Sequence, residues 1–201
     1  QRGNHFTIWG SKALEGSVDR VVRDQMSPVV FPVTFEELDA RIDFSSIAAG
    51  ERRSGRGYEV EAFEVQHPGG ALGYRFRAPG SSQSIVYVSD NEVGAPEKYD
   101  SAPGWRQSFV DFVRGATVLV HDSMYTTEEY DHHHGWGHST FRDAVEVAMD
   151  AGVGTLVLFH HEPRRSDDEL DQRIDECRAL VRSRGGALQV LGAAEGLTLT
   201  V

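Results

Sequence analysis

Apolar and polar residues alternate most clearly in the middle of the chain. Residues 58–65 have the period of two that is typical of a β-strand, and runs 72–77 and 84–89 are two further strand candidates. The turn-forming segment 79–82, Pro-Gly-Ser-Ser, separates the last two runs. The pattern therefore predicts three strands, of which the second and third form an antiparallel hairpin.

From residue 105 onward, helical and strand-like patterns alternate. Two of the helices have start signals, because Thr140 precedes Asp143 and Ser166 precedes Glu169 at capping-box spacing. Strands that alternate with helices indicate an α/β layered fold, to which the hairpin adds an antiparallel part. The predicted elements are helices at 105–114, 140–151 and 167–184, and strands at 117–120, 155–159, 188–191 and 197–201.

The first third of the chain is less regular. An amphipathic helix is predicted over 12–26, ended by Pro28, and a short polar helix over 36–40. A loop rich in Gly and Arg follows at 50–57. No repeat, low-complexity segment or linker divides the sequence, so we expect a single domain over 1–201.

Composition narrows the function classes. The 201 residues carry a net charge of −11, which argues against a nucleic-acid partner bound through a basic surface. No apolar stretch approaches the roughly 20 residues of a membrane span, so no membrane association is expected. The single cysteine, Cys177, excludes an internal disulfide and a zinc-thiolate cluster and fits a reducing cytoplasmic setting.

Histidine and aspartate residues follow four of the predicted strands. His67, Asp90, the pair His121-Asp122 and the pair His160-His161 each come at a strand end. In α/β proteins, functional sites gather at the carboxyl ends of strands, where the loops converge. The sequence therefore predicts one constellation of these side chains at one edge of the sheet.

Each of these residues also has a structural interpretation. A single His after a strand is more often a surface or hydrogen-bonded residue than a ligand, and Asp90 before Asn91 is typical of an Asx-turn. Residues 132–134, three histidines in a polar loop, are expected to be solvated. The recurrence at four strand ends is what favours a functional site.

Five segments, in this order, resemble the metallo-β-lactamase superfamily. The resemblance is to its phosphodiesterases, in the branch of ribonuclease Z and the cyclic phosphodiesterases, and it covers 58–201 well and the first third loosely. It implies the αββα sandwich of that superfamily. The segments are His67-Pro-Gly-Gly-Ala-Leu-Gly-Tyr, Val88-Ser-Asp-Asn, His121-Asp-Ser-Met-Tyr, His138-Ser-Thr and Leu156-Val-Leu-Phe-His.

The resemblance implies a site for two divalent metal ions. His67 would bind the first ion, His160 the second, and Asp90 would bridge both. Neutral imidazole and carboxylate ligands suit zinc, with manganese or iron as alternatives. Two such cations activate a bridging water and hold the phosphate oxygens of a substrate.

The resemblance also implies three catalytic residues. His138 would contact the scissile phosphate or protonate the leaving oxygen. His121 and Asp122 resemble a histidine–acid pair that supports proton transfer.

One element of the family is missing from the sequence. The family motif His-x-His-x-Asp-His, which supplies four ligands near the N-terminus, does not occur among the 201 residues. Relatives carry it upstream of a segment resembling residues 3–10, so we expect either that several tens of residues precede Gln1 or that the protein has lost them. The N-terminal portion of the fold is then incomplete, and the chain alone should bind metal poorly and be inactive.

These observations favour a metal-dependent phosphodiesterase, when complete, that acts on a small or cyclic phosphodiester. A lactonase or other ester hydrolase on the same scaffold is the second enzymatic alternative. The alternative of another class is a non-catalytic binding domain that has lost the metal motif. An α/β domain with scattered histidines is the plainest interpretation. By analogy with relatives, a homodimer is one expected assembly.

Overall fold

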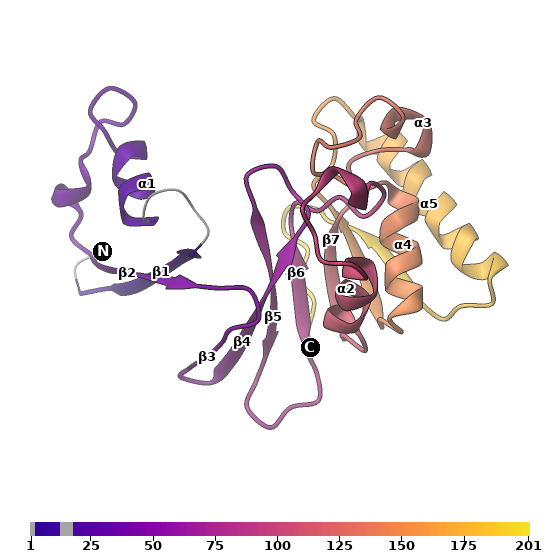
Figure 1. Ribbon diagram of the computed structural model, residues 1–201, viewed down its shortest axis with the longest axis horizontal. Coiled ribbons are helices and arrows are strands. Elements are labelled where there is room, and N and C mark those ends of the chain that lie inside the picture. Colours follow the sequence, from indigo (N-terminus) through magenta and orange to yellow (C-terminus); the bar gives the residue numbers. More distant parts are fainter. Residues whose placement is uncertain (1–2, 13–17) are drawn as a thin grey trace. The chain divides into compact units, whose positions relative to one another are not determined.

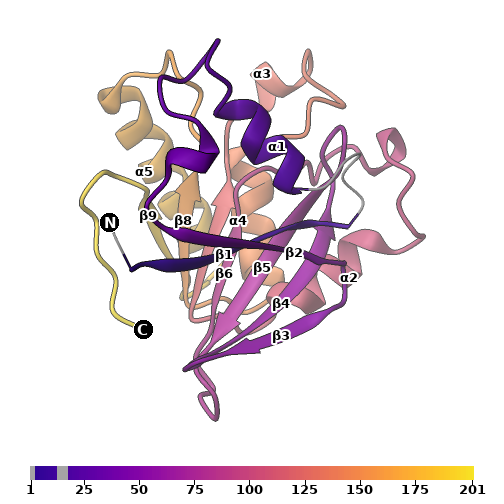
Figure 2. The same ribbon diagram turned by 90° about the vertical axis from the view of Figure 1, so that its left-hand side faces the viewer.

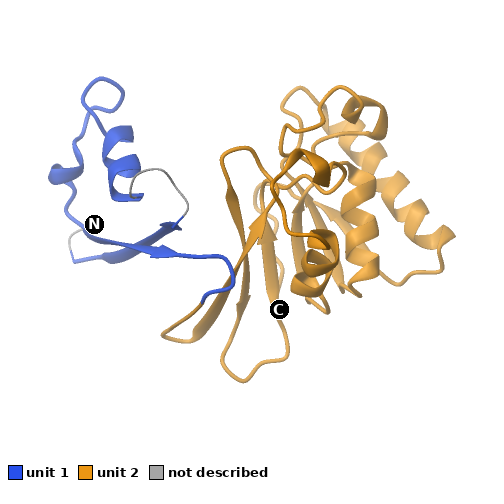
Figure 3. Ribbon diagram, viewed as in Figure 1, with its two compact units in different colours: residues 1–51 blue, residues 52–201 orange. Residues whose placement is uncertain are grey.

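The computed structural model describes residues 3–12 and 18–201. The chain forms two compact units, Gln1–Glu51 and Arg52–Val201, which Figure 3 colours separately. Each unit is described by itself. The single domain expected over 1–201 stays a prediction.

The first unit is built on two parallel strands. Strand β1 (His5–Ser11) pairs in parallel with β2 (Arg41–Ile47), and helix α1 (Val18–Gln25) contacts both. A 3-10 helix, η1 (Phe35–Glu37), lies between α1 and β2 in the sequence. The ring of Phe35 packs on that of Phe44 in β2, with centroids 5.5 Å apart.

The second unit contains a seven-stranded mixed sheet. Its order is β3-β4-β5-β6-β7-β8-β9 (Figure 2); neighbours are antiparallel from β3 to β6 and parallel from β6 to β9. The predicted hairpin is thus confirmed as β5-β6. The strands are β3 (Arg52–Gly55), β4 (Tyr58–Val65), β5 (Ala71–Arg77), β6 (Ile85–Val88), β7 (Val118–Asp122), β8 (Thr155–Phe159) and β9 (Gln189–Gly192).

Three longer helices of this unit, α2, α4 and α5, lie along one face of the sheet (Figure 1). Helix α2 contacts β4, α4 contacts β7 and β8, and α5 contacts β9. The core between them holds Phe109, Val145 and Leu156, which are fully buried. No helix among the described residues has the length and apolar character that a membrane span needs. The helical elements are η2 (Pro96–Lys98), α2 (Trp105–Val113), α3 (Thr127–Tyr130), α4 (Phe141–Asp150) and α5 (Asp167–Ser183).

The predicted capping boxes are confirmed. The side chain of Thr140 accepts from the backbone N–H of Asp143 at the start of α4, and Ser166 does the same with Glu169 at α5. Such a cap contributes about 0.5–2 kcal/mol to helix stability. Local sequence therefore determines where these two helices begin.

Several predicted elements need correction. The helix expected over 12–26 is observed as α1 only; residues 13–17 lie outside the described part. The helix expected over 36–40 is the 3-10 turn η1 at Phe35–Glu37. Residues 197–201 form no strand, because Leu197, Leu199 and Val201 are 46%, 39% and 38% exposed and pair with no neighbour among the described strands.

Three strands were not predicted, namely β1, β2 and β3. Strand β3 reads Arg-Arg-Ser-Gly and lies at the edge of the sheet, where polar residues are common, so it has no apolar alternation to recognise. Strands β1 and β2 lie 30 residues or more apart in the sequence, and only their pairing in space defines them.

The single cysteine is expected to be chemically inert in the folded protein. Cys177 is 4% exposed, and burial raises the pKa of its thiol from the usual 9.0 to about 12. Since each pKa unit is a factor of ten, the thiolate fraction at neutral pH falls about 10³-fold. We expect a disulfide reagent such as dithionitrobenzoate to label the protein only after denaturation; rapid labelling of the native state would contradict this burial.

Candidate metal and phosphodiester site

The strand ends that carry the predicted residues meet at one edge of the seven-stranded sheet. Strands β6, β7 and β8 are parallel. Strand β4 runs the same way as β6, because β5 is antiparallel to both. His67, Asp90, Asp122 and His160 therefore leave four strands at the same edge.

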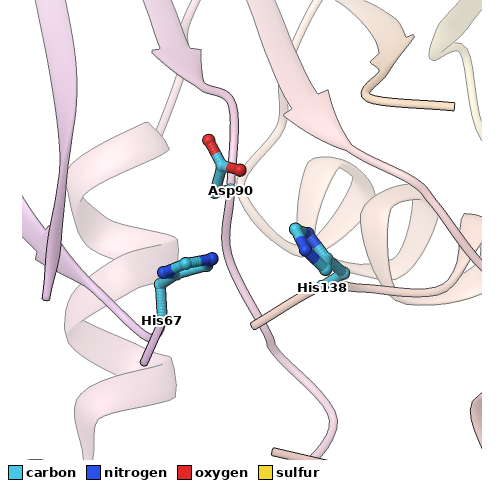
Figure 4. A group of neighbouring side chains, drawn as sticks. All are labelled: His67, Asp90 and His138. Carbon is cyan, nitrogen blue, oxygen red and sulfur yellow. The ribbon is translucent and has the colours of Figure 1, made fainter. Parts of the chain in front are cut away.

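His67, Asp90 and His138 form the closest group of metal-binding side chains among the described residues (Figure 4). Their ligand atoms all lie within 4.8 Å of one another, and each residue is half-buried. Two imidazoles and a carboxylate at this spacing fit zinc, manganese or iron. The structure thus brings His138, which the sequence interpretation treated as an acid, into the group with two predicted ligands.

His160 lies next to this group. Its Nε2 is 3.7 Å from Asp90 Oδ1, and its ring stacks on that of His138 with centroids 4.7 Å apart. The backbone of His160 has φ of 57°, the one left-handed value at a non-glycine residue in the described chain. Such a conformation costs about 1–3 kcal/mol and is found most often at functional sites.

Asp122 is a fully buried carboxylate that organises this edge. Its Oδ1 accepts from the backbone N–H groups of Met124 (3.1 Å) and Ser139 (3.2 Å), and its Oδ2 from that of Asn91 (3.3 Å). His138 Nδ1 lies 2.7 Å from the same Oδ2. An ionised carboxylate only accepts, so His138 donates Nδ1–H and keeps Nε2 available for a cation or a substrate.

The charges around His138 favour its protonated form. Burial of the ring lowers its pKa, but the hydrogen bond and charge of Asp122 outweigh burial, and the charges of Asp90 and Glu92 add to them. The net effect is a raised pKa for His138. An imidazole of this kind is suited to protonate a leaving group.

His121 is buried in the core of the second unit, beside the ring of Phe109. His121 lies two residues after Leu119 in β7, so both side chains point to the face of the sheet that the helices cover. The His121 side chain is 0% exposed, and its ring centroid lies 5.6 Å from that of Phe109. Burial lowers the pKa of His121, which keeps it neutral. Of the predicted pair, only Asp122 contacts His138, and the support of proton transfer by His121 stays a prediction.

His121 contacts Asn91, which the sequence interpretation did not recognise. His121 donates Nδ1–H to the carbonyl of Asp122 (2.6 Å), and its Nε2 lies 3.2 Å from Asn91 Nδ2. Asn91 Oδ1 accepts from the backbone N–H of Gln66, next to His67. One amide side chain therefore connects the ends of β4, β6 and β7.

Glu92 is a second unrecognised residue. It is 0% exposed and accepts from the hydroxyls of Tyr99 and Tyr130 (2.5 Å) and from the backbone N–H groups of Gly135 and Gly137 (both 2.8 Å). Burial raises the pKa of Glu92, but these four hydrogen bonds together hold it below the usual value. The only sequence signal was a charged residue directly before the short segment Val93-Gly-Ala.

The three consecutive histidines 132–134 are only partly as expected. His132 and His134 are exposed, and His134 stacks on Tyr130. His133 is half-buried; its ring stacks on Tyr125 at 4.4 Å, and its Nδ1 lies 2.6 Å from the carbonyl of Glu129. Local packing explains these residues without a metal.

Gly137 lies directly against the side chain of His67. A Cβ at this position would lie 2.2 Å from His67 Cδ2, and φ is +92°. Gly137→Ala is therefore expected to push His67 and the loop apart and to weaken zinc binding, measured by titration calorimetry. Gly135→Ala is the matched control, because its φ is also positive (+85°) but its Cβ would meet nothing closer than Lys98 at 3.6 Å. Equal zinc affinity in the two variants would show that the contact with His67 is unimportant.

The amino-acid sequence of the chain matches a known protein family. The family model described as "Beta-lactamase superfamily domain" matches residues 1–161. Ribonuclease Z of Shouchella clausii is 26% identical over 210 residues, which cover 87% of this chain and 64% of that protein. The chain thus spans less than two thirds of the length of this relative.

Solved structures show the same fold. Unliganded yeast PDE1 superposes with a TM-score of 0.68 at 18% identity, over 94% of this chain and 58% of that one. The short form of human tRNase Z gives 0.64 at 16% identity, over 96% and 66%. The α/β fold expected from the sequence, with its mixed sheet, is thereby confirmed as the metallo-β-lactamase type. The chain belongs to the beta-lactamase superfamily domain family, in the branch that includes ribonuclease Z.

Proposed function

We propose that the protein carrying this chain is a metal-dependent phosphodiesterase. The observation that carries the proposal is the proximity of metal-binding side chains to a histidine held by a buried carboxylate. The side chains of His67 and Asp90, two of the proposed metal ligands, lie beside His138, which is hydrogen-bonded to the buried carboxylate of Asp122. The similarity to ribonuclease Z supports a phosphodiester substrate.

His67, Asp90 and His160 are the proposed ligands of two divalent cations, with Asp90 shared. The short distances that join Asp90 to both histidines support this assignment. Zinc is the preferred ion, and manganese or iron would accept the same donors. When bound, such cations lower the pKa of water and offset negative charge on phosphate oxygens.

His138 is the proposed general acid. Asp122 orients its ring through Nδ1 and stabilises the imidazolium, which leaves Nε2–H to protonate the leaving oxygen. His121 takes no proton from the substrate; it positions Asp122 and Asn91 from behind. In this proposal His138 is the acid, and Asp122 holds it in place.

Two substrate classes remain as proposals. The net charge of −11 favours a small or cyclic phosphodiester. The relatives named ribonuclease Z favour RNA, so a nucleic-acid substrate is the second candidate, in place of the expected absence of a nucleic-acid partner. An ester or lactone substrate and a homodimeric assembly stay predictions.

The test measures metal content by elemental analysis and turnover of bis(p-nitrophenyl) phosphate. It uses the protein expressed from its complete reading frame beside the 201-residue chain, with an RNA oligonucleotide and a lactone as further substrates. About two equivalents of metal and chelator-sensitive phosphodiester turnover are expected for the former. A well-folded protein without metal or turnover would favour the non-catalytic binding domain, and turnover of the lactone alone would favour the ester hydrolase.

A further inference from the structure

Glu92 is the point where three segments around the site are tied together. Its donors come from the segment after η2 (Tyr99), from α3 (Tyr130) and from the loop that leads to His138 (Gly135 and Gly137). Each carboxylate oxygen accepts one tyrosine hydroxyl and one backbone N–H. All four acceptor sites that a carboxylate offers are thus occupied by protein donors.

The loop held by Glu92 is the one that carries the site. We define it as the clamped loop, residues 131–138. Gly137 packs against His67, and just beyond His138 the hydroxyl of Ser139 donates to the carbonyl of Asn91 and accepts from the N–H of Val93. The segment from Asn91 to Val93 therefore holds both the loop and its exit.

A buried charge is a costly way to stabilise a loop. Taking a carboxylate out of water is unfavourable, and apolar side chains of similar volume would often stabilise the fold as well. A carboxylate is, however, able to orient two backbone N–H groups on either side of a residue, which an apolar side chain cannot do. This geometry fixes the path of the chain up to Gly137, the residue directly before His138.

We propose that Glu92 is a positioning residue that holds the clamped loop so that His138 meets Asp122, Asp90 and His67. The proposal rests on the proposed function for its effect on turnover, but its structural content does not depend on it. The competing interpretation is that Glu92 only stabilises the fold, without a specific effect through His138.

The first test is a double-mutant cycle with Glu92→Gln and His138→Ala in the protein expressed from its complete reading frame. It is measured at saturating zinc as kcat on a ribonucleoside 2′,3′-cyclic phosphate, whose alkoxide leaving oxygen needs a proton. The amide of Gln replaces one acceptor oxygen by a donor that faces a backbone N–H, so the loop loses one of its ties. Disturbing the partners of metal-site residues typically costs about 10–100-fold, and we expect that loss in the wild-type background. In the His138→Ala background, Glu92→Gln should change kcat less than about twofold.

If Glu92→Gln lowers kcat by the same factor with His138 and with Ala at that position, the proposal is overturned. A general loss of folded protein lowers kcat whether or not His138 is present. Glu97→Gln is the matched control: Glu97 is an exposed glutamate five residues away, and its substitution should leave kcat unchanged. If Glu92→Gln does not fold, Tyr130→Phe and Tyr99→Phe each remove one hydroxyl donor, and their cycles with His138→Ala must show the same coupling.

A second readout separates this proposal from the proposed function. Amide hydrogen exchange of Gly135 and Gly137 should accelerate at least about tenfold in Glu92→Gln but not in Glu97→Gln. If the wild-type protein turns over no phosphodiester, the proposed function fails. Faster amide exchange and weaker zinc binding in Glu92→Gln would still support positioning by Glu92. Unchanged exchange and unchanged zinc affinity would overturn the positioning role whatever the activity.

Discussion

Asp90→Ala is expected to remove most metal binding from the protein while leaving it folded. The Asp90 side chain is 32% exposed, so little packing is lost with it. It is, however, the group that lies near both His67 and His160. Because loss of an outer partner of a ligand already costs roughly 10–100-fold in affinity or activity, loss of a shared ligand should weaken zinc binding by more than about 100-fold.

The measurement is elemental analysis after gel filtration, with zinc affinity from calorimetry and folding from circular dichroism. Asp100→Ala is a suitable control, since Asp100 is an exposed aspartate in the loop after the same strand, β6. Wild-type metal content in Asp90→Ala would refute the bridging role. Loss of metal in both variants would point to a general effect on the loop.

Asp122→Asn should lower both stability and turnover. The carboxylate accepts from three backbone N–H groups and from His138, and an amide of the same shape can accept at only one of its two positions. At least one buried donor is then left facing another donor, which costs about 1–3 kcal/mol. The expected loss of turnover is about 10²–10⁴-fold, because the tautomer and charge of His138 are no longer set.

Urea unfolding reports the first effect and kcat the second. The exposed Asp131, in the loop before His138, provides the control: Asp131→Asn should change neither quantity much. A variant Asp122→Asn that is destabilised yet keeps wild-type kcat per folded molecule would remove Asp122 from the catalytic pair and leave it a structural residue.

Some of the site could be predicted because it follows from strand direction. The positions of His67, Asp90 and His160 after apolar runs predicted one shared edge, and the parallel and antiparallel pairings of β4 to β8 produce that edge. The burial of His121 was also implicit, since its parity with Leu119 directs it to the helix side. Weighing that parity would have separated His121 from Asp122 on the sequence alone.

The roles of Asn91, Glu92 and the loop carrying His138 could not be predicted. Glu92 contacts Gly135 and Gly137, which are more than 40 residues away in the sequence, and no local period or motif links them. A buried carboxylate is recognised only when its donors are known, because the same letter in the sequence is most often a solvated surface residue.

Elements that depend on neighbouring residues could be predicted from the amino-acid sequence. Strands 58–65 and 155–159 and the starts of α4 and α5 follow from side-chain period and capping, which act within a few residues. Three features became known only from the three-dimensional structure: the pairing of β1 with β2, the polar edge strand β3, and the proximity of His138 to His67 and Asp90. These features depend on contacts between distant segments, whose free energy exists only once the chain has brought them together.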